Sequence, residues 1–110
     1  MFRFILLFSL STQVFASPSG ADVIAACEES LASGFQGIKG MMCTWYVTPC
    51  DCTYAKDPAT PRVCLPEGKE TEELAREVIQ GLGLRQELQA LSAELSANTV
   101  LAEKYPCALE

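Results

Sequence analysis

The sequence predicts an all-α fold, a small bundle of about four helices stapled by disulfides. Apolar residues recur at spacings of three and four along most of the chain, which is the helical period. Glycines and prolines divide these stretches from one another. The chain of 110 residues has six cysteines, of which Cys27 is the first and Cys107 the last. An even cysteine count in a short chain with an export signal indicates a disulfide framework.

The first helix is predicted to begin after Ser19, a good N-cap residue. Asp22 stands three residues later, as in a capping box with Asp in place of Glu. Gly34 is expected to end this helix. Its apolar face has helical spacing and consists of Val23, Ile24, Cys27 and Leu31.

The second helix is predicted from an apolar stripe in steps of three, four and three, and Pro49 stops it. We expect this stripe to face the core, with Trp45 inside and Tyr46 at its flank. The alternative for these two aromatic residues is a role at an interface. The stripe consists of Phe35, Ile38, Met42 and Trp45.

The periodic pattern breaks down over residues 50–66, where Pro58, Pro61 and Pro66 indicate an irregular loop. The third helix is expected to start at the cap residue Thr71. It should end at Gly81 and Gly83. Glu72 and Glu73 suit the positive end of its dipole, and its apolar face consists of Leu74, Val78, Ile79 and Leu82.

A stripe of leucines predicts the fourth and longest helix, which should run to about Tyr105 before Pro106. We expect this stripe to belong to the core. Excess apolar surface along it could equally form a dimer seam. The stripe consists of Leu84, Leu88, Leu91, Leu95 and Leu101. No strand and no internal repeat is predicted.

Helical geometry suggests two of the disulfides. If the chain turns at Gly34 and Phe35, Cys27 and Cys43 lie at the same level of two adjacent helices, because they are equally far from Phe35. Cys64 precedes the third helix and Cys107 follows the fourth. If these two helices are antiparallel neighbours, their outer ends meet and Cys64 can pair with Cys107. That bridge closes a loop of about 40 residues and contributes about 4 kcal/mol in the chain-entropy model.

Cys50 and Cys52 remain, and their pairing stays open. A direct bridge across one intervening residue is strained but feasible. Alternatively, one of them takes Cys64 or Cys107 as its partner and displaces the other. Four cysteines allow three connectivities, so the sequence does not choose between them.

Residues 1–16 have the pattern of a secretory signal peptide. Arg3 supplies the positive charge, an apolar run follows, and Val14 and Ala16 fit a cleavage site. The apolar run is far shorter than the ~20 residues that span a bilayer. We therefore expect an exported protein whose residues 17–110 form a single helical domain; the alternative is a buried N-terminal helix.

Composition excludes several functions. The chain has no histidine, so it holds no Ser-His-Asp triad, Cys-His dyad or imidazole-ligated metal. Its 14 acidic and 8 basic residues give a net charge of −6, which becomes −7 once Arg3 is removed. Such an acidic chain is repelled by nucleic acid and by an anionic membrane, so we expect neither as a partner. We expect no enzyme activity, cofactor or metal.

Glutamates gather at the start of the third helix. They belong to a solvated helix start, or they attract a basic partner and raise the rate of association. They are Glu67, Glu70, Glu72, Glu73 and Glu77.

The chain resembles a family of small periplasmic immunity proteins of type VI secretion, the Tai family and its Rap relatives. The specific part of the resemblance is the Cys64-Leu65-Pro66 motif together with Tyr105-Pro106-Cys107. The surrounding residues 62–68 and 100–107 fit the same pattern, and residues 27–30 and 37–40 fit it more loosely.

The resemblance implies an all-helical, disulfide-bonded and often homodimeric protein that inhibits a peptidoglycan amidase effector. Such proteins place a loop at the active-site cleft of the amidase. The matching loop here is the proline-rich segment 53–62, between Cys52 and Cys64. Its partner-binding residues would be Tyr54, Lys56, Asp57 and Arg62. The alternative is a solvated linker without a partner.

Two other functions are weighed against this one. Thiolates in the Cys50-Asp51-Cys52 motif could bind a soft metal ion or exchange disulfides in the periplasm. An exported hydrolase would depend on carboxylates alone, which usually need a cleft that raises their pKa. Most acidic residues here fall at exposed helical positions, so the hydrolase is disfavoured.

Overall fold

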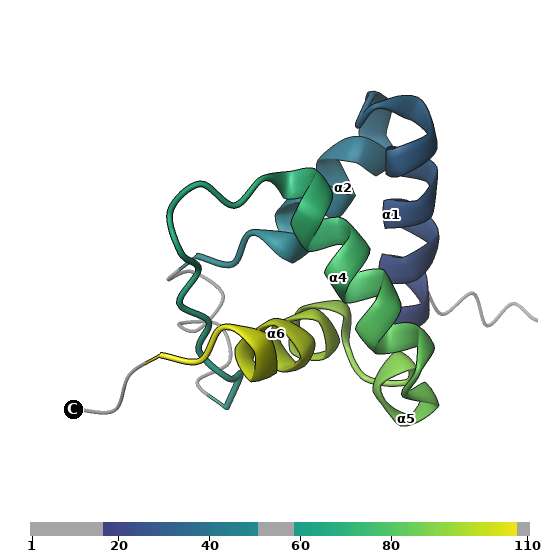
Figure 1. Ribbon diagram of the computed structural model, residues 1–110. Coiled ribbons are helices and arrows are strands. Elements are labelled where there is room, and N and C mark those ends of the chain that lie inside the picture. Colours follow the sequence, from purple (N-terminus) through teal and green to yellow (C-terminus); the bar gives the residue numbers. More distant parts are fainter. Residues whose placement is uncertain (1–16, 51–58, 108–110) are drawn as a thin grey trace, which may run out of the picture.

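The computed structural model describes residues 17–50 and 59–107, and within these residues the fold is entirely helical (Figure 1). The predicted all-α, disulfide-stapled bundle is confirmed. The helices are α1 (Gly20–Ser33), α2 (Gly37–Val47), α4 (Thr71–Gly83), α5 (Gln86–Gln89) and α6 (Ala93–Lys104). Among the described residues, no helix is long and apolar enough to cross a membrane.

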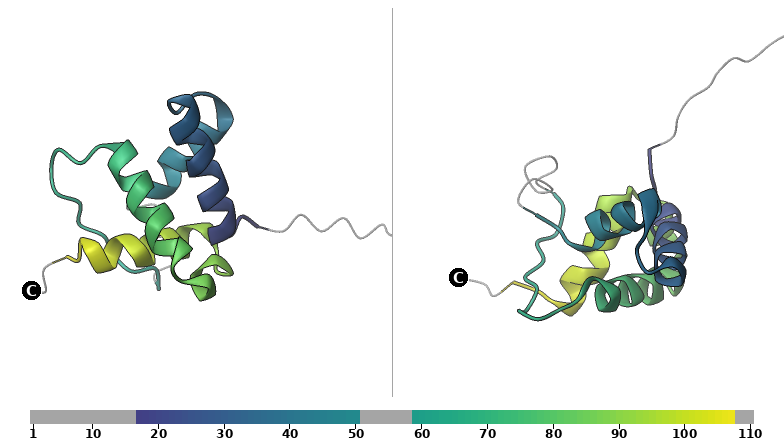
Figure 2. Two further views of the ribbon diagram at one scale, coloured as in Figure 1. Left: turned by 45° about the vertical axis from the view of Figure 1, so that its right-hand side comes forward. Right: turned by 90° about the horizontal axis from the view of Figure 1, so that it is seen from above.

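Helices α1 and α2 form a hairpin, α4 crosses beside it, and α6 lies at an angle beneath them (Figures 1 and 2). Helix α1 contacts all the other described helices and therefore lies at the centre of the bundle. The core receives side chains from every helix. Its largest fully buried apolar members are Val23, Val47, Leu74, Val78, Leu82 and Leu101.

The α1–α2 hairpin forms as predicted. The backbone N–H of Ser19 donates to the Asp22 carboxylate at 2.8 Å, and Gly34 ends α1 in the left-handed conformation at φ 74°. Cys27 and Cys43 form the expected disulfide and are both fully buried. The covalent staple therefore lies inside the core between the two helices.

The face that α2 turns to the core differs from the prediction. Cys43, Tyr46 and Val47 are buried, whereas Trp45 is 59% exposed. Gly40 is also buried, and it packs so closely against the preceding turn that a Cβ on it would lie 2.4 Å from the backbone carbonyl of Phe35. In this orientation two members of the predicted stripe, Ile38 and Trp45, face outward, whereas Phe35 and Met42 are partly buried against the core.

Helix α4 has the predicted apolar face, with Leu74, Val78 and Leu82 buried. Its N-cap is Glu70 rather than Thr71, and the Glu70 N–H donates to Glu73 at 3.2 Å. Gly81 does not end the helix. A Cβ on Gly81 would lie 2.6 Å from Val100 of α6, so this glycine allows α4 and α6 to pack closely.

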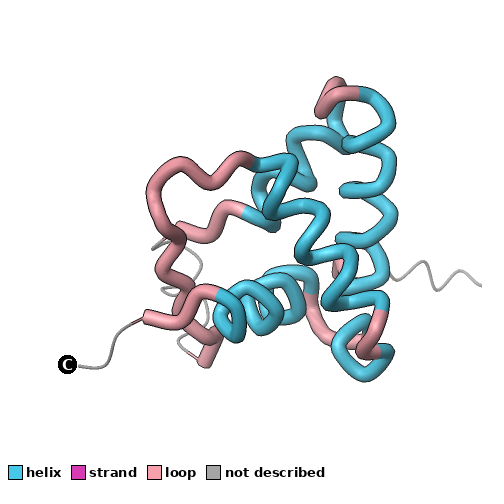
Figure 3. The backbone as a smooth tube through the Cα atoms, viewed as in Figure 1, coloured by secondary structure: helices cyan, strands magenta, loops and turns pink. Residues whose placement is uncertain are grey.

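The predicted long fourth helix is two helices, α5 and α6, with a break at residues 90–92 (Figure 3). Ser92 caps α6 by accepting a hydrogen bond from the Leu95 N–H. The residues around the start of α1 form backbone hydrogen bonds with this break. The Gly20 N–H donates to Leu91 O, and the Ala93 N–H donates to Pro18 O. These contacts replace the backbone hydrogen bonds of a continuous helix.

The leucine stripe of the broken helix is mostly core. Leu88 and Leu101 are buried, and Leu91 and Leu95 are partly buried. Leu84 alone among them is strongly exposed, at 80%. A single exposed leucine does not make a dimer seam along this stripe.

Candidate partner-binding surfaces

The segment 59–69 leads from the predicted loop into α4, and the bundle holds it at several points. Cys64 forms the predicted disulfide with Cys107. The Cys64 N–H donates to Tyr105 O at 3.0 Å, and Val63 pairs with Pro106 in an isolated antiparallel bridge. The base of the predicted loop is therefore fixed against the C-terminal end of α6.

A buried amide adds a contact from the middle of α6. Asn98 is 1% exposed and its Nδ2 donates to Pro61 O at 3.4 Å. A buried amide requires a partner because its unsatisfied donors are costly. This contact holds the segment next to Arg62, whose side chain lies at an exposed position.

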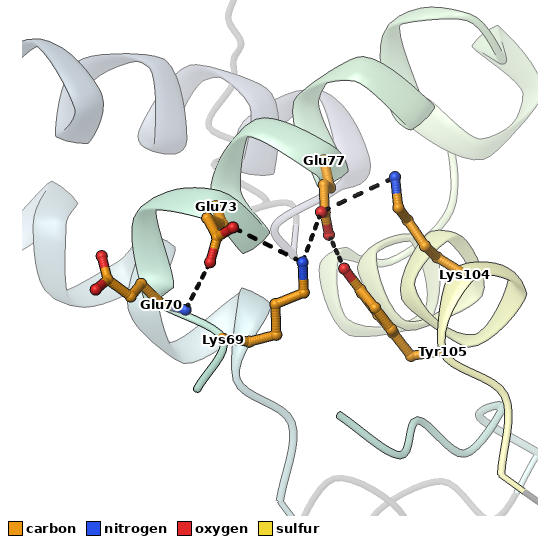
Figure 4. Close-up of polar contacts among 6 residues, drawn as sticks. All are labelled: Lys69, Glu70, Glu73, Glu77, Lys104 and Tyr105. Atoms are coloured by element: carbon orange, nitrogen blue, oxygen red, sulfur yellow. Dashed lines mark hydrogen bonds and ion pairs between the residues drawn. The ribbon is translucent and has the colours of Figure 1, made fainter. Parts of the chain in front are cut away.

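Four side chains form a polar cluster between the segment 59–69, α4 and α6 (Figure 4). We call it the Glu77 cluster; it consists of Lys69, Glu77, Lys104 and Tyr105. The Tyr105 hydroxyl donates to Glu77 at 2.7 Å, and Lys69 Nζ lies 3.3 Å from the same carboxylate. Lys104 Nζ lies 3.9 Å from it. Lys69 also stands over the Tyr105 ring, 5.1 Å from the centroid.

The contacts in the cluster shift the pKa values of Glu77 and Lys69. Burial by itself would raise the pKa of Glu77, but hydrogen bonds from Tyr105 and Lys69 and the charge of Lys104 outweigh it, so this pKa is lowered. Hydrogen bonding with Tyr105 and Glu77 raises the pKa of Lys69 to about 12. At neutral pH Glu77 is therefore a carboxylate and Lys69 an ammonium, and their contacts join the segment 59–69 to α4.

The contacts of the segment 59–69 hold the base of the predicted partner-binding loop against the bundle. Of the four residues proposed to bind the partner, Arg62 is exposed at this base. Tyr54, Lys56 and Asp57 lie outside the described residues. Most of the predicted acidic patch is a solvent-exposed helix start, but Glu77 is turned into the cluster, with a side chain 17% exposed.

The outer side of α2 is a second candidate surface, and it includes Ile38 and Trp45, two residues of the stripe that was expected to face the core. We call it the α2 outer face; it consists of Ile38, Met41 and Trp45, which are 76%, 73% and 59% exposed. Met41 and Trp45 lie between two apolar grooves. One groove is lined further by Phe35, Gly40, Thr44 and Thr48, and the other by Ile38, Met42 and Tyr46.

The turn before α2 fixes one wall of this surface. Phe35 has φ 65°, a left-handed conformation that is rare for a bulky residue, and its backbone lies against Gly40. The Ser30 hydroxyl shares its hydrogen bond between Ala26 O and Lys39 O, at 2.7 and 2.9 Å. The sequence does carry a signal of this exposed face: Lys39 is the only charged residue of α2, so the helix is apolar on both sides.

The described residues bear on the proposed metal-binding motif Cys50-Asp51-Cys52 at one position. Cys50 is disulfide-bonded and is therefore not a free thiolate for a metal ion. Cys52 lies outside the described residues. Within the described ranges, no group of three or more Cys, Asp or Glu side chains is arranged to hold a metal ion.

Comparison with known proteins agrees with the resemblance that the paired cysteine motifs indicate. The family model of the Rap1a immunity proteins matches residues 19–107, which include the whole described bundle and both described disulfides. No curated protein and no solved structure matches the chain. Because the family model covers most of its length, this chain belongs to the Rap1a immunity protein family.

Proposed function

We propose that this protein is a periplasmic immunity protein that inhibits a type VI secretion peptidoglycan amidase effector by occluding its active-site cleft. Membership of the Rap1a family supports the statement that this is an immunity protein, because an immunity protein binds a cognate effector. The amidase, the secretion system and the periplasmic location are our proposals, drawn from the cysteine motifs and the signal-peptide pattern of residues 1–16.

The inhibitory element that we propose is the loop 53–62, with Tyr54, Lys56, Asp57 and Arg62 contacting the effector. The base of this loop is fixed by the Cys64–Cys107 disulfide and by the Asn98 contact to Pro61. An ordered base supports this proposal, because a segment that is already held loses less conformational entropy on binding. Inhibition by such a protein requires no catalytic residue and no cofactor of its own.

A cellular experiment tests the proposed function. We expect an amidase gene beside the gene of this protein. Its product is directed to the periplasm of a susceptible strain, with the full chain or with a variant lacking residues 1–16. The full chain should prevent lysis, and the variant without the signal peptide should not. Lysis despite production of the full chain would contradict the proposed function, and protection by the truncated variant would contradict the proposed location.

We also propose that two copies of this protein associate. The leucine stripe does not support this association, because it is mostly buried within one chain. The exposed apolar surface of α2 supports it, since an apolar side of a helix usually packs against another surface.

A further inference from the structure

We propose that the α2 outer face is the surface through which two copies of this chain bind each other. The inference rests on the proposed association of two copies, but it is independent of the identity of the effector. Ile38, Met41 and Trp45 form a continuous stripe along α2 and are all more than half exposed. Exposed apolar stripes of this kind mark interaction surfaces, and exposed tryptophans are enriched at the centres of interfaces.

The charge of the chain favours a second copy as the occupant of this face. With a net charge of −6, two copies repel each other over most of their surface. No acidic residue occurs between Glu29 and Asp51, and Lys39 is the only basic residue in that interval. Two copies can therefore approach through α2 without bringing carboxylates together.

The shape of the face is self-complementary. Met41 and Trp45 are four residues apart and form a ridge, with an apolar groove on either side. In a two-fold pair the same surface of both copies meets, so the ridge of one helix enters a groove of the other. One groove is already shaped in the single chain, because the close approach of Phe35 to Gly40 fixes its wall.

An effector is a less suitable occupant. The effector contact that we propose uses a loop with charged residues and an aromatic residue, and such a contact depends on complementary charge. The α2 outer face presents only apolar side chains and Lys39 close by. If the effector occupied this face, a charge introduced there would abolish inhibition and leave the oligomeric state unchanged.

Molar mass in solution tests the inference. Sedimentation equilibrium of the mature chain should give the mass of two copies at micromolar concentration, and Met41→Glu should give the mass of one. Leu84→Glu is the matched control, because Leu84 is 80% exposed but lies outside α2. It should keep the mass of two copies. A monomeric wild-type chain, a dimeric Met41→Glu variant or a monomeric Leu84→Glu variant would each overturn the inference.

Fluorescence of the unmodified chain gives a second test, which requires no substitution that could disturb folding. Trp45 is the only tryptophan in the chain, so its emission reports on this face alone. Dilution should move the emission to longer wavelength in parallel with the loss of dimer mass. An emission maximum that stays constant while the dimer dissociates would place the interface elsewhere.

The same variants separate this inference from the proposed function. A monomeric Met41→Glu chain that still inhibits the amidase supports the α2 interface and places inhibition on another surface. A dimeric wild-type chain that does not bind the amidase would refute the proposed effector and leave the α2 interface intact. Loss of inhibition by a still dimeric Met41→Glu chain would overturn the inference, because the face would then belong to the effector.

Discussion

The Tyr105 hydroxyl donates a 2.7 Å hydrogen bond to the Glu77 carboxylate and thereby joins the residue that follows α6 to the middle of α4. The same tyrosine accepts the Cys64 N–H through its backbone carbonyl. It also stands two residues before Cys107, the partner of Cys64. One residue of the Tyr105-Pro106-Cys107 motif thus connects the base of the proposed loop to the core of the bundle.

Tyr105→Phe tests this connection. The variant keeps the ring under Lys69 and removes the hydrogen bond to Glu77, which leaves the carboxylate with its lysine contacts. A net loss of about 1 kcal/mol in the free energy of unfolding is expected for one such bond. Denaturant unfolding measures it, with Tyr46→Phe as a control in another part of the core. An unchanged midpoint for Tyr105→Phe would show that the bond does not stabilise the fold.

The lowered pKa of Glu77 predicts a dependence of stability on pH. Its pKa in the folded chain lies below its ordinary value of 4.5, so its stabilising contribution is complete above that value. This contribution is lost as the pH falls through the lower folded-state pKa. Glu77→Gln should therefore lose stability at neutral pH and show a weaker acid dependence than the wild type.

Unfolding midpoints measured at neutral pH and in the acid range test this prediction. Glu28→Gln, at an exposed position of α1, is the control and should follow the wild-type curve. Parallel acid dependence in the wild type and in Glu77→Gln would assign the effect to other carboxylates.

The sequence was sufficient for the features that depend on local pattern. Gly34 and Phe35 placed the turn of the hairpin, and equal distances from that turn brought Cys27 and Cys43 together. The pairing of Cys64 with Cys107 followed from their positions at the outer ends of two helices, on the premise that these helices are antiparallel neighbours. Local capping residues and helical spacing need no knowledge of the rest of the chain.

The features that failed depend on contacts between distant residues. Helix α2 is apolar on both sides, so periodicity could not tell that Trp45 faces outward. Gly81 resembled a helix stop, but it makes room for Val100 of α6. The break before Ala93 is held by Pro18, which is far away in sequence. The proposed effector-binding loop lies largely outside the described residues, so its role stays a prediction.

Gly40→Ala tests the packing that orients α2. A Cβ at this position would lie 2.4 Å from the Phe35 carbonyl, so the turn or the helix must shift. Overpacking of this kind costs about 1–3 kcal/mol. Gly83→Ala is a matched control, because a Cβ there meets nothing within 4 Å. Thermal unfolding should show a clear loss of stability for Gly40→Ala alone; equal melting temperatures would mean that the turn adapts freely.

The proposed loop is tested by alanine substitutions at Tyr54, Asp57 and Arg62. Each should weaken inhibition of the amidase by about tenfold or more, the effect of losing a contact worth about 1.4 kcal/mol. The melting temperatures of the Tyr54 and Asp57 variants should stay at the wild-type value. Gln80→Ala, at an exposed position of α4, is the control and should inhibit fully. Full inhibition by all three loop variants would move the effector interface away from this loop.

Inhibition of the purified amidase by the purified mature chain tests the central claim most directly. The amidase expected in the neighbouring gene is titrated with residues 17–110, and release of the cleaved peptidoglycan products is measured. Cleavage should fall to zero at a stoichiometric ratio of the two proteins. Undiminished cleavage in the presence of excess folded, disulfide-bonded chain would contradict it.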